Sequence, residues 1–247
     1  MAPIQALIFD VFGTVVDWRS SVVAELELVG KKSGAEKATA DWARFAQEWR
    51  TGYMTKTRQI AAGASGPRNV DVMHREILDE LLTRPEWSQI GELWDESTRQ
   101  SLNLVWHRLN GWPDSVEGLK ELKKHTIIAT LSNGNVRLLT DMAKHAALPW
   151  DMIFSTELFD TFKPNPKAYL ETMRHLAVQP HECFMVAAHI FDLRAAASLG
   201  MRTVYVPRPD EDVVVDVKSK AEGGEVDYVV KSFIELAQII EQLNASG

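Results

Sequence analysis

The sequence contains a single cysteine, Cys183, in 247 residues. One cysteine excludes an intrachain disulfide, so the fold must depend on a hydrophobic core, and the 45% of hydrophobic residues can supply a sizeable one. Cys183 lies in the apolar stretch Cys183-Phe184-Met185-Val186. We therefore expect it to be a buried structural thiol and not a reactive one.

Long hydrophobic runs are also missing. No apolar run approaches the roughly 20 residues that a membrane-spanning helix needs. The N-terminus lacks a basic segment, and its apolar run Ala6-Leu7-Ile8-Phe9 meets the charged residue Asp10 at once. This pattern is typical of a first strand and not of a signal peptide. The sequence predicts a soluble protein of the cytoplasm with no membrane partner.

Positive charge is in the minority, with 27 Lys and Arg against 34 Asp and Glu and a formal net charge of −7. An acidic surface repels the phosphates of nucleic acids, so a nucleic-acid partner is not expected. The 25% of charged residues is ordinary for a soluble globular protein. The length suits one large domain or a core with one inserted module.

Short apolar runs that end at polar residues recur along the chain, as parallel strands buried on both faces do. The strong candidates are 4–9, 126–131, 184–188 and 203–206, and 152–154 is a weaker one. Helical patterns lie between or after them at 116–124, 166–176, 193–199 and 233–243. Strands that alternate with helices predict an α/β fold with a parallel sheet and right-handed crossovers.

The segment from about residue 18 to 109 differs because it has no clean strand pattern. Its stretches 42–53 and 72–82 are typical of helices, and 63–67 is typical of a loop. Six of the eight tryptophans lie here: Trp18, Trp42, Trp49, Trp87, Trp94 and Trp106. We expect a helical module, 18–109, inserted into a core formed by 1–17 and 110–247. The segment 210–216 is expected to be an acidic, Val-rich piece of surface.

Polar residues follow the predicted strands, where ligands bind in open α/β sheets. They are Asp10, Thr14, Ser132, Asn133, Lys163, His189 and Asp192. A carboxylate at a strand tip can act as a nucleophile, and a lysine with a second carboxylate can balance its charge and tune its pKa. Each residue also has a structural explanation, as a helix cap, a turn former or a solvated loop lysine. Their joint occurrence at successive strand ends favours a catalytic site.

Four segments resemble the motifs of the haloacid dehalogenase superfamily. They are Asp10-Val11-Phe12-Gly13-Thr14, Leu131-Ser132-Asn133-Gly134, Phe162-Lys163-Pro164-Asn165-Pro166 and the segment around Asp192. The resemblance spans nearly the whole chain. It implies a Rossmann-like core with a cap over the active site, and the inserted helical module fits that cap.

The first motif resembles the L-2-haloacid dehalogenases of this superfamily in particular. The phosphatases carry a second Asp two residues after the nucleophile as a general acid, and here that position is Phe12. A phenyl ring cannot protonate a leaving alkoxide, whereas halide leaves without a proton. Trp49-Arg50 resembles the cap pair whose arginine faces the halogen. Tyr169 matches the tyrosine that follows the lysine motif.

The fourth motif departs from the common dehalogenase pattern. Ala187-Ala188-His189 and Asp192 stand where Ser-x-Asn-x-Trp-Asp is usual. This form resembles a distinct branch of the same dehalogenases. We expect His189 to help Asp192 orient or deprotonate the hydrolytic water, since an imidazole with a pKa near 6.5 suits that work. The alternative is a neutral histidine that only replaces the hydrogen bonds of the amide.

The resemblance implies a reaction in two steps. Asp10 attacks C2 of a short 2-haloalkanoate and expels halide with inversion, and water then hydrolyses the aspartyl ester to the 2-hydroxy acid. Lys163 would hold Asp10 ionised, while Arg50 and Asn133 would stabilise the departing halide.

Among the remaining residues, Ser132 and backbone N–H groups near Asn133 would bind the substrate carboxylate. Thr14 and Tyr169 would be supporting hydrogen-bonders, and Phe12 would line the substrate pocket. For Arg50, a surface helix arginine is the alternative interpretation.

The resemblance implies no metal and no cofactor, since a haloacid is a monoanion that Lys163 and Arg50 can balance. The implied partner is a small haloacid, and the family alone implies a homodimer. Two alternatives remain open: a Mg²⁺-dependent phosphatase of the same superfamily, and a catalytically silent binding protein.

Overall fold

Six parallel strands form the central sheet of the protein, in a computed structural model that describes residues 3–35, 41–212 and 215–245. They are β1 (Ala6–Phe9), β4 (Ile127–Ser132), β5 (Met152–Ser155), β6 (Cys183–Ala187), β7 (Arg202–Tyr205) and β8 (Tyr228–Val229). All five predicted strands are confirmed. The prediction missed β8 because two residues are too short to form a recognisable apolar run. The short strands β2 (Val16–Asp17) and β3 (Asn110–Gly111) form a separate antiparallel pair.

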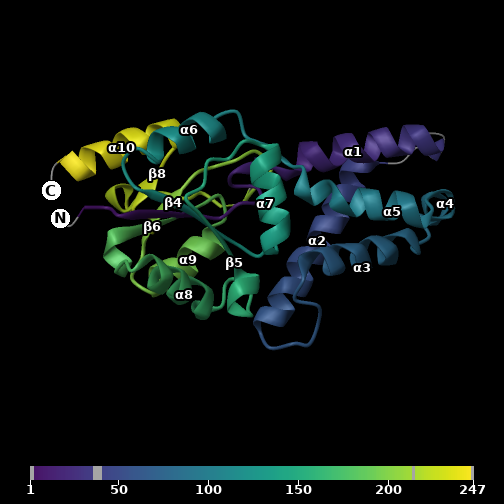
Figure 1. Ribbon diagram of the computed structural model, residues 1–247, viewed down its shortest axis with the longest axis horizontal. Helices are drawn as coiled ribbons and strands as arrows, with labels where there is room; N and C mark the ends of the chain where they lie inside the picture. The colour runs from purple at the N-terminus through teal and green to yellow at the C-terminus, as the bar shows by residue number, and fades with distance from the viewer. Residues whose placement is uncertain (1–2, 36–40, 213–214, 246–247) are drawn as a thin grey trace.

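Helices cover both faces of the sheet, so the predicted α/β class with a Rossmann-like core is confirmed (Figure 1). In Figure 1, α6 (Ser115–Leu122) and α10 (Phe233–Ala245) lie above the sheet, and α8 (Pro166–Leu176) and α9 (Ile190–Ser198) lie below it. All residues of β1 and β6 are buried, which explains their apolar sequences. Cys183 is buried as predicted, and burial raises the pKa of its thiol to about 12.

The strand order β5-β4-β1-β6-β7-β8 places a reversal of direction at β1. Phe9, the last residue of β1, pairs with Thr130 of β4 on one side and with Val186 of β6 on the other. The connections from these strands leave in opposite directions, which opens a crevice at their carboxyl ends. The residues after β1, β4 and β6 therefore meet at one point.

The described elements between β2 and β3 are all helical. They are α1 (Trp18–Ser33), α2 (Trp42–Ala61), α3 (Val70–Leu82), α4 (Ser88–Leu93), α5 (Glu96–Asn103) and the 3₁₀ helix η2 (Leu104–His107). Figure 1 shows these helices extending away from the sheet, at the end opposite to both termini. Trp49, Trp94 and Trp106 are buried among them. Aromatic packing thus explains why the tryptophans concentrate in this segment.

The remaining elements are short or lie at the boundary between the two parts. They are α7 (Val136–His145) and the 3₁₀ helices η3 (Thr156–Phe159), η4 (Pro180–Glu182) and η5 (Lys220–Glu222). The helix α7 packs against both β5 and η2. None of the described helices has the length and apolar character needed to cross a membrane.

A buried histidine joins the helical module to the core. The two ring nitrogens of His107 each lie 3.0 Å from a carboxylate, one of Asp71 in α3 and one of Asp141 in α7. Asn135 of the core also donates to Asp71, over 3.0 Å. Burial disfavours the charged ring, but the two carboxylates raise the pKa of His107 overall. This contact holds the helical module over the carboxyl end of the sheet.

Candidate active site

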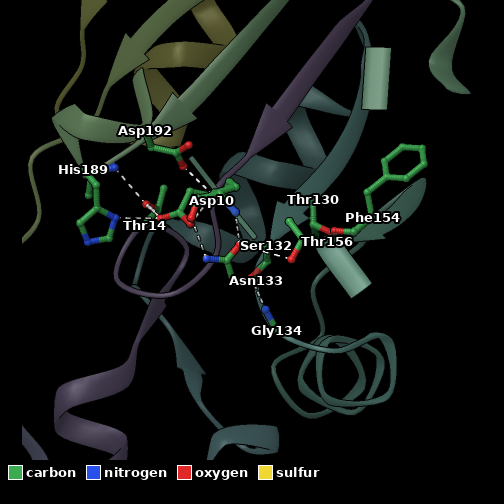
Figure 2. Close-up of polar contacts among 12 residues, drawn as sticks. Asp10, Thr14, Thr130, Ser132, Asn133, Gly134, Phe154, Thr156, His189 and Asp192 are labelled. Carbon is green, nitrogen blue, oxygen red and sulfur yellow. Dashed lines mark hydrogen bonds and ion pairs between the residues drawn. The ribbon is translucent and has the colours of Figure 1, made fainter. Parts of the chain in front are cut away.

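Asp10 follows β1 directly and stands at the centre of the polar cluster in Figure 2. Its backbone N–H donates to Val186 of β6 over 3.0 Å, which continues the sheet pairing by one residue. One carboxylate oxygen, Oδ1, accepts from the Lys163 ammonium at 2.9 Å. The other, Oδ2, accepts from the Thr14 hydroxyl at 2.7 Å and lies 2.9 Å from His189 Nδ1. Three other residues predicted from strand ends thus converge on the Asp10 carboxylate.

Lys163 bridges two buried carboxylates. Its ammonium donates to Asp10 over 2.9 Å and to Asp192 over 2.5 Å. The second oxygen of Asp192 accepts from the Tyr169 hydroxyl. The backbone N–H of Lys163 donates to the side-chain oxygen of Asn133 over 2.7 Å, which secures the loop that carries the lysine.

The electrostatics of this cluster keep Asp10 ionised. Burial alone would raise the pKa of Asp10, but the Lys163 ammonium and the His189 ring together hold it well below its usual range. Burial, with the nearby negative charge of Asp10, raises the pKa of Asp192 despite the pull of Lys163. Burial opposes a charge on Lys163, but the two carboxylates raise its pKa overall. Asp10 is therefore the carboxylate best suited to act as an anionic nucleophile.

His189 lies between Asp10 and a third carboxylate, Glu211. Its Nε2 lies 2.8 Å from Glu211 Oε2, and the other oxygen of Glu211 accepts from the Trp18 indole over 2.5 Å. Burial would lower the pKa of His189, but the hydrogen bonds to Asp10 and Glu211 raise it to about 9. The two carboxylates thus favour the protonated ring of His189, whereas the sequence suggested a ring with a pKa near 6.5. Its contacts are with Asp10 and Glu211, whereas Asp192 pairs with Lys163 and Tyr169.

The prediction of a surface segment at 210–216 is wrong for Glu211, whose side chain is only 11% exposed. Glu211 reaches into the site, and Asp212 accepts from the backbone N–H of Ile190 at the start of α9 over 2.5 Å. Residues 213 and 214 lie outside the described part of the chain. No local pattern marks Glu211 as a site residue, because it is one of several carboxylates in an acidic loop.

A small cavity of about 30 Å³ opens above the Asp10 carboxylate. Its lining comes from the strand ends and from α2: Asp10, Phe12, Arg50, Tyr53, Met54, Ser132, Asn133, Lys163, His189 and Phe191. The guanidinium of Arg50 lies 5.0 to 5.5 Å from the ring centres of Phe12, Trp18 and Tyr53. Its Nη1 is buried and has no hydrogen-bond partner among the described residues. A cationic donor in an aromatic setting is thus available to an anion in the cavity.

Several predicted site residues have roles in the structure that differ in detail from the expectation. The Ser132 hydroxyl, on the cavity wall, accepts from the backbone N–H of Gly134 at 3.2 Å (Figure 2). The Asn133 amide is engaged with the backbone of Lys163 and with the Thr156 hydroxyl, at 3.3 Å from the latter. Tyr169 does not line the cavity, and its hydroxyl donates to Asp192, which also accepts from Lys163. Arg50 is buried, which excludes the interpretation as a surface helix arginine.

The side chains of the site offer no group of three or more His, Cys, Asp or Glu residues that could hold a metal ion, as judged over the described residues. The gap between Asp10 and Asp192 is filled by the Lys163 ammonium. The arrangement that the structure displays is a buried carboxylate pair balanced by side-chain cations.

Comparison with known proteins places this site in context. A family model described as a haloacid dehalogenase-like hydrolase matches residues 4–200. The chain is 28% identical over 214 residues to (S)-2-haloacid dehalogenase 4A of Burkholderia cepacia, covering 83% of this chain and 84% of that protein.

Solved structures extend the similarity over almost the full length. The defluorinating L-2-haloacid dehalogenase Rha0230 is 35% identical with a TM-score of 0.84, covering 96% of this chain and 95% of that one. The L-2-haloacid dehalogenase PA0810 is 32% identical with a TM-score of 0.82, covering 96% of this chain and 99% of that one.

Proposed function

The chain belongs to the haloacid dehalogenase-like hydrolases and is similar to their L-2-haloacid dehalogenases, and we propose that it hydrolyses the carbon–halide bond of short (S)-2-haloalkanoic acids to give 2-hydroxy acids. One observation carries this proposal above the others. An ionised carboxylate, Asp10, faces a small cavity in which Phe12 stands in place of a general acid. Such a site can displace a leaving group that needs no proton.

In the first step, a carboxylate oxygen of Asp10 attacks C2 of the substrate from the side opposite to the halogen. The new C2–O bond forms as the carbon–halogen bond breaks, so the configuration at C2 inverts and an aspartyl ester results. Lys163 and Thr14 keep the attacking group in position through their hydrogen bonds to Asp10.

The departing halide gathers negative charge, and the free guanidinium nitrogen of Arg50 is the donor placed to stabilise it. Arg50 comes from α2 and lines the cavity together with residues from the strand ends. The helical module 18–109 therefore acts as the cap of the active site. Ser132 and the nearby backbone bind the substrate carboxylate. Asn133 secures the loop that carries Lys163, in addition to lining the cavity.

In the second step, water attacks the ester carbonyl of Asp10 and releases the 2-hydroxy acid. His189 lies beside Asp10. Once His189 has released the proton on Nδ1, the ring can accept a proton from that water. Asp192 and Tyr169 hold Lys163 in place during the cycle.

The enantiomers of 2-chloropropionate test the proposal directly. We expect chloride release from the (S) enantiomer, with (R)-lactate as the product, and at least a tenfold slower release from the (R) enantiomer. Chloride titration and chiral chromatography of the product measure both. Release of phosphate from an aryl phosphate with Mg²⁺, without any halide release, would instead support a phosphatase.

The size of the cavity leads to an expectation about the leaving group. A cavity needs a volume of roughly 10–15 Å³ to hold a water-sized group. This cavity has a volume of about 30 Å³, so the smallest haloacids fit best. Fluoride is a poor leaving group that needs a strong donor, which the cationic Arg50 supplies. We therefore expect fluoride release from fluoroacetate, and the similar protein Rha0230 is itself described as defluorinating.

A fluoride electrode measures this reaction, with chloroacetate as the reference substrate. Arg50→Lys keeps the charge but loses the forked geometry of the guanidinium. The variant is expected to lower fluoride release at least tenfold more than chloride release. Fluoride at background level, with active chloroacetate turnover in the same preparation, would contradict the expectation.

A further inference from the structure

We propose that Glu211 is a positioning residue for ester hydrolysis: it holds the imidazole of His189 by Nε2, so that Nδ1 faces the Asp10 ester and can accept a proton from the attacking water. The proposal rests on the proposed function, because it concerns the second step of that reaction. Glu211 neither contacts Asp10 nor lines the cavity itself, and it acts through His189.

The geometry of the three groups supports this role. His189 Nδ1 lies 2.9 Å from Asp10 Oδ2, and His189 Nε2 lies 2.8 Å from Glu211 Oε2. The imidazole therefore joins the two carboxylates through its opposite nitrogens. An imidazole in such a setting has one nitrogen anchored and the other directed at the reacting group, as a general base requires.

The carboxylate of Glu211 is itself held in place. Its Oε1 accepts from the Trp18 indole over 2.5 Å, and the side chain is only 11% exposed. Gly13 of the nucleophile loop, at φ +83°, passes so close that a Cβ there would lie 2.5 Å from Glu211 Oε1. Only glycine leaves room for this carboxylate, so the backbone next to Asp10 and the 210–212 loop are fitted to one another.

The charge on His189 depends on the state of Asp10. In the free enzyme the ring has anionic neighbours on both sides, Asp10 and Glu211, and it carries a proton on each nitrogen. The cations nearby are Lys163, which pairs with the other oxygen of Asp10, and Arg50, which faces Glu211. Formation of the ester removes the negative charge of Asp10. The imidazolium then has a single carboxylate partner and releases the Nδ1 proton to solvent.

Hydrolysis then restores the starting state with all atoms accounted for. Water oxygen bonds to the ester carbonyl carbon of Asp10, and one water proton passes to Nδ1 of His189. As the bond from that carbon to the C2 oxygen breaks, the second water proton goes to the departing alkoxide, which leaves as the 2-hydroxy acid. Asp10 is again a carboxylate and His189 again an imidazolium. Over the cycle, haloacid and water give hydroxy acid, halide and the one proton released at the ester stage.

Glu211→Gln tests this role because it removes the charge while keeping the size of the side chain. We expect the first-turnover halide burst to stay within twofold of wild type, whereas steady-state turnover falls at least tenfold. Intact-protein mass spectrometry should then show the acyl adduct. His189→Asn should give the same pattern. Asp210→Asn, in the same loop, removes an exposed charge without a contact to His189 and is expected to match wild type.

The pH dependence separates positioning from a purely structural effect. Without the Glu211 carboxylate the ring holds its proton less tightly, so the acid limb of single-turnover ester hydrolysis should move to lower pH in Glu211→Gln. A variant with wild-type turnover and an unchanged pH profile would overturn the proposal. A variant in which the halide burst and the steady-state turnover fall by the same factor would also overturn it, because Glu211 would then only support the fold of the site.

Nitrogen NMR of His189 provides a measurement that is independent of turnover. In the free wild-type enzyme both ring nitrogens should carry protons at pH 7, and Glu211→Gln should lower the midpoint of that titration; a titration unchanged by the substitution would overturn the proposal. His189→Asn assigns the signals. A wild-type enzyme that releases no halide from any 2-haloacid would contradict the proposed function, and the titration still decides whether Glu211 controls the ring.

Discussion

Replacing Asp10 with asparagine is expected to lower halide release by about 10⁴-fold or more, as removal of a catalytic nucleophile does in other enzymes. The amide has nearly the same shape as the carboxylate, so the packing of β1 against β4 and β6 is kept. It has no negative charge, however, and its nitrogen is a poor nucleophile towards carbon. The hydrogen bond from Lys163 would also lose its charged acceptor. Chloride release from (S)-2-chloropropionate measures the effect.

Isotope labelling identifies the atom that attacks C2. A single turnover in ¹⁸O water, with enzyme in excess, should place the label in the Asp10 carboxylate, because water attacks the ester carbonyl and not C2. Mass spectrometry of the peptide that contains Asp10 detects the label. Label found only in the 2-hydroxy acid would mean that water attacks C2 directly, and Asp10 would then not be the nucleophile.

The lowered pKa of Asp10 also predicts the acid behaviour of the enzyme. The unfolded-state pKa of an Asp side chain is about 3.9, and the folded-state pKa of Asp10 lies below it. Such a carboxylate stabilises the fold at a pH above about 3.9 and loses this contribution as the pH falls below about 3.9 towards the folded-state pKa. Protonation of Asp10 is therefore not expected to limit activity between about pH 5 and 8. Any acid limb in this range should come from the ester-hydrolysis step, in which His189 must be neutral.

The second large effect is expected for Lys163→Met, which replaces the ammonium by an apolar chain of similar length. Asp10 and Asp192 would then lie in a buried site without the ammonium that bridges them. Breaking a buried ion pair by removing one partner costs about 3–5 kcal/mol. We expect a loss of stability of that order, measured by urea unfolding at pH 7. Halide release should fall about 10³-fold or more, since the pKa of the nucleophile rises.

The pH dependence of unfolding checks the cause of this effect. Without Lys163, burial and the charge of Asp10 raise the pKa of Asp192 further above its unfolded value. A folded state that binds more protons becomes more stable as the pH falls, so the stability difference from wild type should shrink between pH 7 and pH 5. Lys167→Met, an exposed lysine in the first turn of α8, is the matched control and should unfold like wild type. A destabilisation that is constant with pH would point to lost packing instead.

The positions of the polar residues at the strand ends follow from local sequence. Apolar runs buried on both faces must stop at the first polar residue, and parallel strands must align their carboxyl ends. This is why Asp10, Ser132 and His189 could be placed together before the fold was known. With the family resemblance, the identity of Phe12 likewise favours a leaving group that needs no proton, without any geometry, since a phenyl ring has no proton to give. Even the burial of Arg50 follows a pattern, because Ala46, Arg50, Tyr53 and Thr57 recur at helical spacing on the buried face of α2.

Only the tertiary structure decided the charge state of the site. Glu211 lies 22 residues after His189 in a loop whose acidic composition looks like ordinary surface. Its carboxylate reaches the ring because the loop after β7 returns over Gly13, a path that no local pattern encodes. Two carboxylates on opposite nitrogens then raise the pKa of His189 to about 9, whereas residue type alone suggests 6.5. A pKa depends on which charges lie within a few ångströms, and contacts between residues far apart in the sequence exist only once the chain has folded.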